Sequence, residues 1–137
     1  MTTLVDTGLI VAFLNRRDRY HAWAVETLST IRAPLLTCEA VLSEAVFLLR
    51  RLAGGPAKVI ELVTRGVVIP SFRLEGEAPS VKRLLARYGE VPMDLADACL
   101  VRMTELHSDC ILLTIDSEFR NVYRRHGRQA IPTLLPE

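Results

Sequence analysis

The segment PMDLADACLV, residues 92–101, holds two aspartates three residues apart among side chains that are otherwise apolar. At this spacing Asp94 and Asp97 share one side of an expected helix. Burying an unpaired carboxylate has a free-energy cost comparable with the whole stability of a small domain, so Asp97 needs a compensating partner. One explanation is a capping pair, with Asp94 as the N-cap and Asp97 as the acid in the first turn.

Glu44 is another carboxylate in an apolar setting. Glu39 lies in the first turn of the same expected helix, where the helix dipole stabilises an acid and no function is required. Glu44 lies in mid-helix, and its structural explanations are a side chain that extends to water or a pair with Arg51. We favour a functional role, because the neighbours three and four residues away are all apolar: Ala40, Val41, Phe47 and Leu48.

Two more aspartates follow expected strands, since LVD ends in Asp6 and LLTID ends in Asp116. The carboxyl ends of parallel strands meet at one edge of an α/β sheet, which is where such sheets bind ligands. Each aspartate also precedes an expected helix and is explained, when taken alone, as its N-cap. Their coincidence at one edge of the sheet favours a shared site.

A metal site explains all of these acids together: Asp6, Glu44, Asp97 and Asp116. If they converge, like charges about 5 Å apart repel by roughly 3 kcal/mol per pair at an effective dielectric constant of about 20. Such a cluster persists only if some carboxylates are protonated or a cation neutralises them. Oxygen ligands without histidine favour Mg²⁺ or Mn²⁺ over zinc. An ion of this kind with open positions activates water and stabilises charge on a phosphate.

The alternation of apolar and amphipathic segments supplies the frame for these acids. The expected strands are 3–6, 34–37, 67–70, 110–116 and 130–135. The expected helices are 7–15, 19–31, 38–53, 56–66, 77–89, one that carries Asp94 and Asp97, and a basic one after Asp116. Thr37 is expected to cap the helix 38–53 and Gly54–Gly55 to end it. Strands that alternate with helices imply a parallel sheet with helices on both faces, in one α/β domain.

The composition is globular, with 50% hydrophobic and 24% charged residues, and the net charge of +1 does not by itself indicate a nucleic-acid partner. The apolar run Leu9–Leu14 is far too short to span a membrane, and no basic residue precedes it as in a secretory signal. The three cysteines lack metal-ligand spacing, so we expect reduced core residues of a cytoplasmic protein: Cys38, Cys99 and Cys110.

Arginines are concentrated in two short segments. One contains Arg16, Arg17 and Arg19, and the other contains Arg120, Arg124, Arg125 and Arg128 without any acid between Phe119 and Ala130. Arginine suits bidentate contacts to phosphate, although a solvated helix face explains any one of these residues alone.

Four segments together resemble the motifs of PIN-domain ribonucleases, and in particular the toxin components of VapBC-type toxin–antitoxin pairs. They are LVDTGLIVAFLNRRDRYHAWA, the Glu44 helix, PMDLADACLV and LLTIDSEF, and the resemblance extends to the terminal IPTLLPE. It assigns the acidic quartet to Asp6, Glu44, Asp97 and Asp116 and a catalytic hydroxyl to Thr114. Gly8 stands where a serine is frequent, which removes one hydroxyl near Asp6. Asp94 is either a cap or an outer-shell metal contact.

The resemblance implies a single PIN domain over residues 1–137, with a three-layer α/β/α sandwich around a central parallel sheet. It implies Mg²⁺- or Mn²⁺-dependent hydrolysis of RNA phosphodiesters, in which a metal-activated water attacks phosphorus and leaves a 5′-phosphate and a 3′-hydroxyl. It also implies a toxin that blocks translation, a homodimer, and inhibition by a cognate antitoxin. In this setting we expect Arg120, Arg124 and Arg125 to contact phosphates of the RNA.

Three other functions are compatible with parts of the pattern. A housekeeping PIN-domain RNA-processing nuclease would carry the same motifs, and this alternative stays open. A Mg²⁺-dependent phosphoacceptor or phosphatase is disfavoured, because position 8 is Gly8 where the phosphatase pattern needs a second aspartate. The two lysines, Lys58 and Lys82, lie in expected helices rather than at the end of a late strand as a receiver domain requires. A pure binding module is disfavoured because no position of the acidic quartet is lost.

Overall fold

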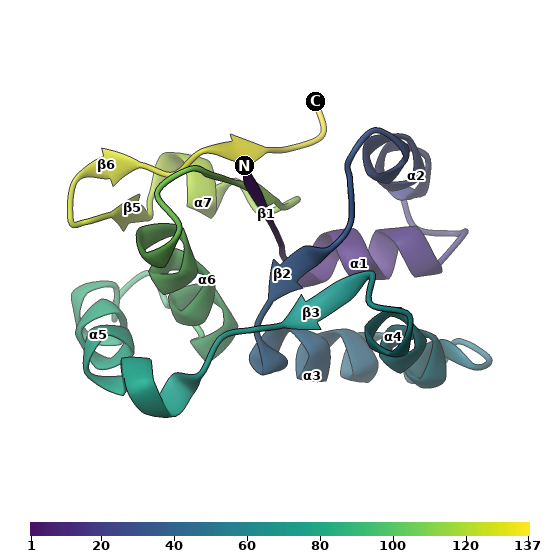
Figure 1. The fold of residues 1–137 in the computed structure, drawn as a ribbon, viewed down its shortest axis with the longest axis horizontal. Helices are drawn as coiled ribbons and strands as arrows, with labels where there is room; N and C mark the ends of the chain where they lie inside the picture. The colour runs from purple at the N-terminus through teal and green to yellow at the C-terminus, as the bar shows by residue number, and fades with distance from the viewer.

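A parallel sheet with the strand order β3-β2-β1-β4-β7 forms the centre of the protein (Figure 1). The computed structural model describes residues 1–137. Leu4 on β1 lies opposite Leu36 on one neighbouring strand and Leu112 on the other. The central strands are buried on both faces, as expected of a parallel sheet. The strands are β1 (Thr2–Val5), β2 (Leu35–Thr37), β3 (Val68–Pro70), β4 (Cys110–Leu113) and β7 (Thr133–Leu134).

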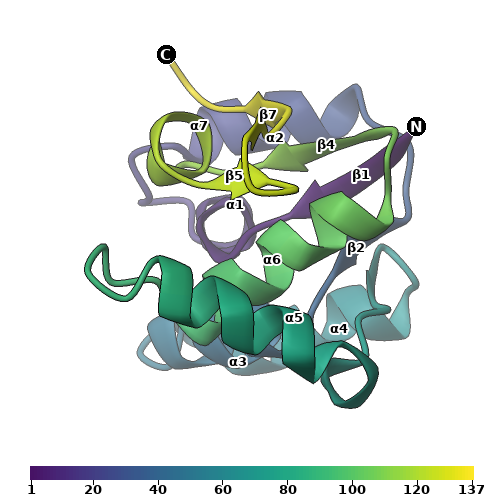
Figure 2. The same cartoon turned by 90° about the vertical axis from the view of Figure 1, so that its left-hand side faces the viewer.

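Helices cover both faces of this sheet, which confirms the predicted α/β/α architecture. Figure 1 shows α1 and α2 on one side of the sheet and α5 and α6 on the other. Figure 2 shows α6 running alongside β1, and α6 packs against both β1 and β4. The helices are α1 (Thr7–Leu14), α2 (His21–Ser29), α3 (Glu39–Leu48), α4 (Gly55–Thr64), α5 (Leu74–Arg87), α6 (Leu95–Leu106) and α7 (Glu118–Asn121).

The start and the end of α3 differ from the prediction. Thr37 does not cap the helix, because its buried hydroxyl donates instead to the Val5 carbonyl on the neighbouring strand, at 2.8 Å. Cys38 takes the N-cap position without a side-chain hydrogen bond. The helix ends before the glycine pair, and Gly54 (φ +70°) instead begins α4 as its N-cap. A side chain at Gly55 is excluded, since a Cβ there would lie 2.3 Å from the Leu49 carbonyl oxygen.

The C-terminal region also differs from the prediction. The strand expected over 110–116 ends at Leu113, and residues 114–116 form a turn. The expected basic helix is reduced to the single turn α7, after which β5 (Arg124–Arg125) pairs antiparallel with β6 (Gln129–Ala130). Two residues between these strands, His126 (φ +52°) and Gly127 (φ +81°), have left-handed backbone conformations that end any helix. The basic segment is therefore a hairpin beside α6.

The core and the surface divide as the composition suggests. The three cysteines are buried and free, as predicted: Cys38, Cys99 and Cys110. None of the helices is both long enough and apolar enough to cross a membrane. An open groove of about 470 Å³ lies between α1, α2 and α4, and 11 of its 13 lining residues are hydrophobic, among them Phe13, Leu28 and Leu62.

Candidate active site

Asp6 lies where β1 passes directly into α1, at the carboxyl edge of the sheet. It is the N-cap of α1, and its Oδ1 accepts a hydrogen bond from the Thr7 N–H at 2.7 Å. Its Oδ2 accepts a hydrogen bond from the Thr114 hydroxyl at 2.8 Å. Only 7% of the residue is exposed, so both carboxylate oxygens are held in place within the protein.

Thr114 joins the ends of two neighbouring strands. Because Val5 on β1 pairs with Leu113 on β4, Thr114, which follows β4 directly, comes beside Asp6. The Thr114 hydroxyl donates to Asp6 and accepts the Asp116 N–H at 3.0 Å. Asp116 in turn accepts the Glu118 N–H through Oδ1 at 2.9 Å. The Thr-x-Asp turn therefore fixes Asp116 relative to Asp6 through one shared hydroxyl.

Asp97 belongs to a capping box at the start of α6. The Asp94 Oδ1 accepts the Asp97 N–H at 2.8 Å, and the Asp94 N–H points to the Asp97 Oδ2 at 3.5 Å. The Tyr123 hydroxyl also donates to the Asp97 Oδ2, at 2.9 Å. The predicted capping explanation is thus confirmed, but it does not exclude a functional role, because Oδ1 of Asp97 accepts no hydrogen bond from the protein.

Glu44 lies half-buried on α3, and it forms neither a hydrogen bond nor an ion pair. The pair with Arg51 that we considered is absent. Glu39 is exposed in the first turn of the same helix, as predicted. The charge of Glu44 nevertheless reaches the site, since it contributes to the raised pKa of Asp6.

Burial and neighbouring charges raise the pKa values of Asp6 and Asp97. Burial raises the pKa of Asp6 to about 6; hydrogen bonds from Thr114 and Thr7 oppose this shift, while the charges of Asp116 and Glu44 add to it. Burial also raises the pKa of Asp97 to about 7, with further contributions from the charges of Asp94 and Asp6. Carboxyls with such raised values are stabilised in the charged form by a cation.

The oxygen atoms that the acids and Thr7 offer are chemically suited to a hard divalent cation. No group of three or more acid, histidine or cysteine side chains is close enough in this structure to hold one ion. However, the ligands offered are all oxygens, and the Thr7 hydroxyl beside Asp6 is buried without a hydrogen-bond partner. Mg²⁺ requires only one or two protein carboxylates because it keeps several of its waters. Asp6 and Asp97 offer two such carboxylates, and the charges of Glu44 and Asp116 act on Asp6.

The arginines predicted to contact RNA have different surroundings. Arg120 is exposed and donates through Nε to the Thr133 hydroxyl at 3.3 Å. Arg124 is half-buried, and its guanidinium donates to the carbonyls of Arg120 and Tyr123. For Arg125 the expectation does not fit the structure. It is only 6% exposed, and its guanidinium donates to carbonyls at the end of α6, those of Thr104, His107 and Ser108.

Tyr123 contacts Asp97 directly, but the sequence did not identify it as a residue of the site. It lies in the segment that we expected to be a basic helix, and it is 26 residues from its carboxylate partner. A tyrosine carries no spacing signal of the kind that identified the acids. At Gly8 an added Cβ would lie 2.4 Å from a side-chain carbon of Ile115, so a larger residue there requires the Ile115 side chain to move.

The sequence and the fold of the chain are both similar to known proteins. Residues 3–125 match the model of the PIN domain, and the chain belongs to the PIN-domain family. Among solved structures, the fold is similar to that of VapC20 from Mycobacterium tuberculosis, a sarcin-ricin loop cleaving toxin. The TM-score is 0.77 at 19% identity, and the match covers 96% of this chain and 100% of that chain. No curated protein sequence matches the chain.

Proposed function

We propose that this PIN-domain protein is a metal-dependent endoribonuclease that hydrolyses RNA phosphodiester bonds and acts as the toxin of a toxin–antitoxin pair. The observation that carries the proposal is the buried Asp6 carboxylate of this PIN domain, which Thr7 and Thr114 hold at the carboxyl edge of the sheet. The similarity of the fold to a sarcin-ricin loop cleaving toxin supports RNA as the substrate.

In this proposal Asp6 and Asp97 hold the metal, and Glu44 and Asp116 complete the acidic surroundings. When bound, Mg²⁺ or Mn²⁺ supplies a Lewis acid that stabilises charge on the phosphate and lowers the pKa of a bound water. Thr114 keeps the Asp6 carboxylate in one orientation, because its hydroxyl is fixed by the Asp116 N–H on its other side. One carboxylate oxygen of Asp94 accepts the Asp97 N–H and so caps the helix. The remaining role of Asp94 is an outer-shell contact to the metal.

Two of the predicted arginines remain candidates for RNA contacts. Arg120 is exposed beside the turn that carries Asp116, so its guanidinium is open to a phosphate. Arg124 is half-buried and would contribute through one side of its guanidinium. Arg125 is not a candidate for an RNA contact, because its guanidinium already donates hydrogen bonds to carbonyls at the end of α6.

The antitoxin partner is assigned to the open groove between α1, α2 and α4. The groove is lined almost entirely by hydrophobic residues and is open to solvent, so an apolar segment of a partner can bind in it. A segment of the antitoxin with an apolar face, such as an amphipathic helix, fits a groove of this composition. Homodimerisation stays a prediction, and light scattering of the purified chain tests it.

Cleavage of RNA by the purified protein tests the function. Activity is expected with Mg²⁺ or Mn²⁺, is expected to stop with EDTA, and is expected to return when metal is added in excess. The matched control is Asp6→Asn purified in parallel, which reports contaminating nuclease. Cleavage that survives exhaustive chelation while the control is inactive would exclude the metal mechanism.

A further inference from the structure

We propose that Tyr123 is a positioning residue of the active site: its hydroxyl holds one oxygen of Asp97 and so leaves the other free to bind the metal. This inference rests on the proposed function, because it assigns Asp97 to the metal. Three features of the structure support it, namely the fixed ring, the anchored segment that follows it, and the distribution of hydrogen bonds on Asp97.

The ring of Tyr123 is wholly buried between two other aromatic rings. It packs edge-to-face against Tyr88, with ring centroids 5.2 Å apart, and against Phe119, with centroids 5.1 Å apart. Aromatic pairs of this geometry are favourable beyond the area that they bury. The phenol therefore presents its hydroxyl to Asp97 from a rigid base.

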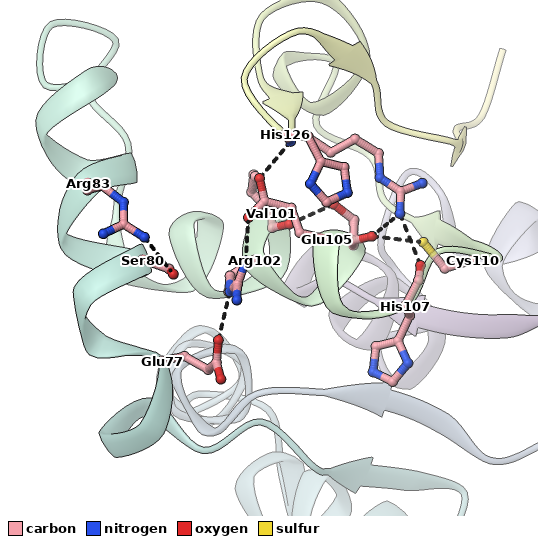
Figure 3. Close-up of polar contacts among 11 residues, drawn as sticks. Glu77, Ser80, Arg83, Val101, Arg102, Glu105, His107, Cys110 and His126 are labelled. Atoms are coloured by element: carbon pink, nitrogen blue, oxygen red, sulfur yellow. Dashed lines mark hydrogen bonds and ion pairs between the residues drawn. The ribbon is translucent and has the colours of Figure 1, made fainter.

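The segment after Tyr123 is tied to the same helix that carries Asp97. The Glu105 Oε2 accepts the His126 N–H at 2.7 Å, and its other oxygen pairs with Arg102 at 3.1 Å. Arg102 pairs in turn with Glu77 on α5 at 2.7 Å, so this chain of contacts extends across two helices (Figure 3). The buried Arg125 guanidinium adds contacts to carbonyls at the end of α6. The segment that follows Tyr123 is therefore attached to α6 by contacts other than the one to Asp97.

The hydrogen bonds of Asp97 are unevenly distributed. Its Oδ2 receives the Tyr123 hydroxyl and faces the Asp94 N–H, whereas its Oδ1 receives no donor from the protein. The carboxylate is therefore held at one oxygen and available at the other. Partners that hydrogen-bond a metal-binding carboxylate fix its orientation and contribute substantially to metal affinity. A phenol does this without adding a positive charge that would compete with the ion. The carboxylate of Glu118 also faces the hydroxyl, but the hydrogen-bond geometry assigns its one proton to Asp97.

The test is Tyr123→Phe in the full chain, which removes the hydroxyl and keeps the ring. Mn²⁺ binding measured by electron paramagnetic resonance, without RNA, is expected to weaken by about 10- to 100-fold. RNA cleavage at limiting Mn²⁺ is expected to fall in proportion and to recover at saturating Mn²⁺. The thermal melt in EDTA is expected to stay close to that of the wild type.

Tyr88→Phe is the matched control. It removes a hydroxyl from the same aromatic cluster, one that accepts the Arg124 N–H at 3.0 Å and does not contact Asp97. Its Mn²⁺ affinity is expected to equal that of the wild type. In an Asp97→Asn background, Tyr123→Phe is expected to have no further effect on Mn²⁺ binding.

Two outcomes overturn the positioning role while leaving the proposed function intact: Mn²⁺ affinity unchanged by Tyr123→Phe although Asp97→Asn reduces it, or equal losses in Tyr88→Phe and Tyr123→Phe. A wild-type protein that neither binds Mn²⁺ nor cleaves RNA overturns the proposed function itself, and the positioning role with it.

Discussion

The same C-terminal segment contacts both ends of α6, but the two contacts differ in kind. At the start of the helix, Tyr123 donates to Asp97, a carboxylate that has one oxygen without a donor. At the end of the helix, the buried Arg125 donates to three main-chain carbonyls, those of Thr104, His107 and Ser108. The Thr104 and His107 carbonyls are among those that every helix leaves without an internal partner, and Ser108 follows the end of the helix.

The contact of Arg125 is structural, whereas the contact of Tyr123 with Asp97 belongs to the proposed active site. A cation at the end of a helix satisfies carbonyls and opposes the negative end of the dipole, so Arg125 is explained by the helix alone. One carboxylate is enough to cap the start of a helix, yet both Asp94 and Asp97 are present, and Asp6 adds its charge to Asp97. In the proposed function, a metal ion neutralises the charge that the cap does not require.

The largest expected effect is that of Asp97→Asn on activity. RNA cleavage should fall about a thousandfold, or about 4 kcal/mol of transition-state stabilisation, because a metal ligand loses its charge. The metal-free protein should be as stable as the wild type or more stable, since the charge that is removed is disfavoured by burial and by Asp94. Cleavage rates and thermal melts in EDTA measure the two effects. A marked loss of stability with retained cleavage would reduce Asp97 to a cap.

Arg125→Met should have the opposite effect at the other end of the helix. The variant keeps most of the side-chain volume but leaves buried carbonyls without donors, so the free energy of unfolding should fall by about 3 kcal/mol. Cleavage per folded molecule should change little, because the residue does not face the site. Urea unfolding measures the loss, and Arg128→Met, at an exposed position, is the control and should change stability by less than about 0.5 kcal/mol. Unaltered stability of Arg125→Met would show that water replaces the guanidinium.

The acids of the site could be predicted from the sequence, whereas the residues that contact the two ends of α6 could not. Asp6, Asp97 and Glu44 were identified because each carboxylate stands in a local apolar context that a strand end or a helical spacing makes unusual. Tyr123 and Arg125 act through contacts with residues about 20 or more positions away, so neither has a local pattern.

The alternation of strands and helices likewise predicted the sheet and its covering, because the apolar segments are local signals. The hairpin after α7 was missed, since it depends on left-handed backbone conformations at His126 and Gly127. Of these two residues only the glycine signals such a turn. The cap of α3 was missed because the Thr37 hydroxyl bonds across the sheet to Val5, a contact that no local pattern predicts.

The raised pKa values of Asp6 and Asp97 predict how the stability of the metal-free protein depends on pH. The pKa of Asp6 is about 6 in the folded state, against 3.8 for an unperturbed aspartate. Below about pH 4 the carboxyl is protonated in both the folded and the unfolded state. Between about pH 4 and about pH 6 the unfolded state releases the proton and the folded state keeps it. The free energy of unfolding therefore falls as the pH rises, by at most about 3 kcal/mol. The pKa of Asp97, about 7, extends this decline to neutral pH.

Urea unfolding in EDTA from about pH 5 to about pH 8 measures this decline. Asp6→Asn should remove the part of the slope that belongs to Asp6, and saturating Mg²⁺ should flatten the slope, because a cation favours the charged carboxylates. Stability that rises over this range in the wild type would contradict the raised pKa values.

The smallest effects separate Glu44 from Glu39, two glutamates on α3 that differ in what surrounds them. Glu44 is half-buried without a partner and acts on Asp6 through its charge, so Glu44→Gln should lower cleavage at limiting metal by about tenfold, or about 1.4 kcal/mol. Glu39 is exposed in the first turn, so Glu39→Gln should leave cleavage unchanged and reduce stability by a few tenths of a kcal/mol through the helix dipole. Both substitutions keep the size of the side chain, and cleavage rates across a Mn²⁺ titration with thermal melts distinguish them. If Glu44→Gln cleaves as fast as the wild type at limiting Mn²⁺, Glu44 is a surface glutamate and the site consists of the three aspartates.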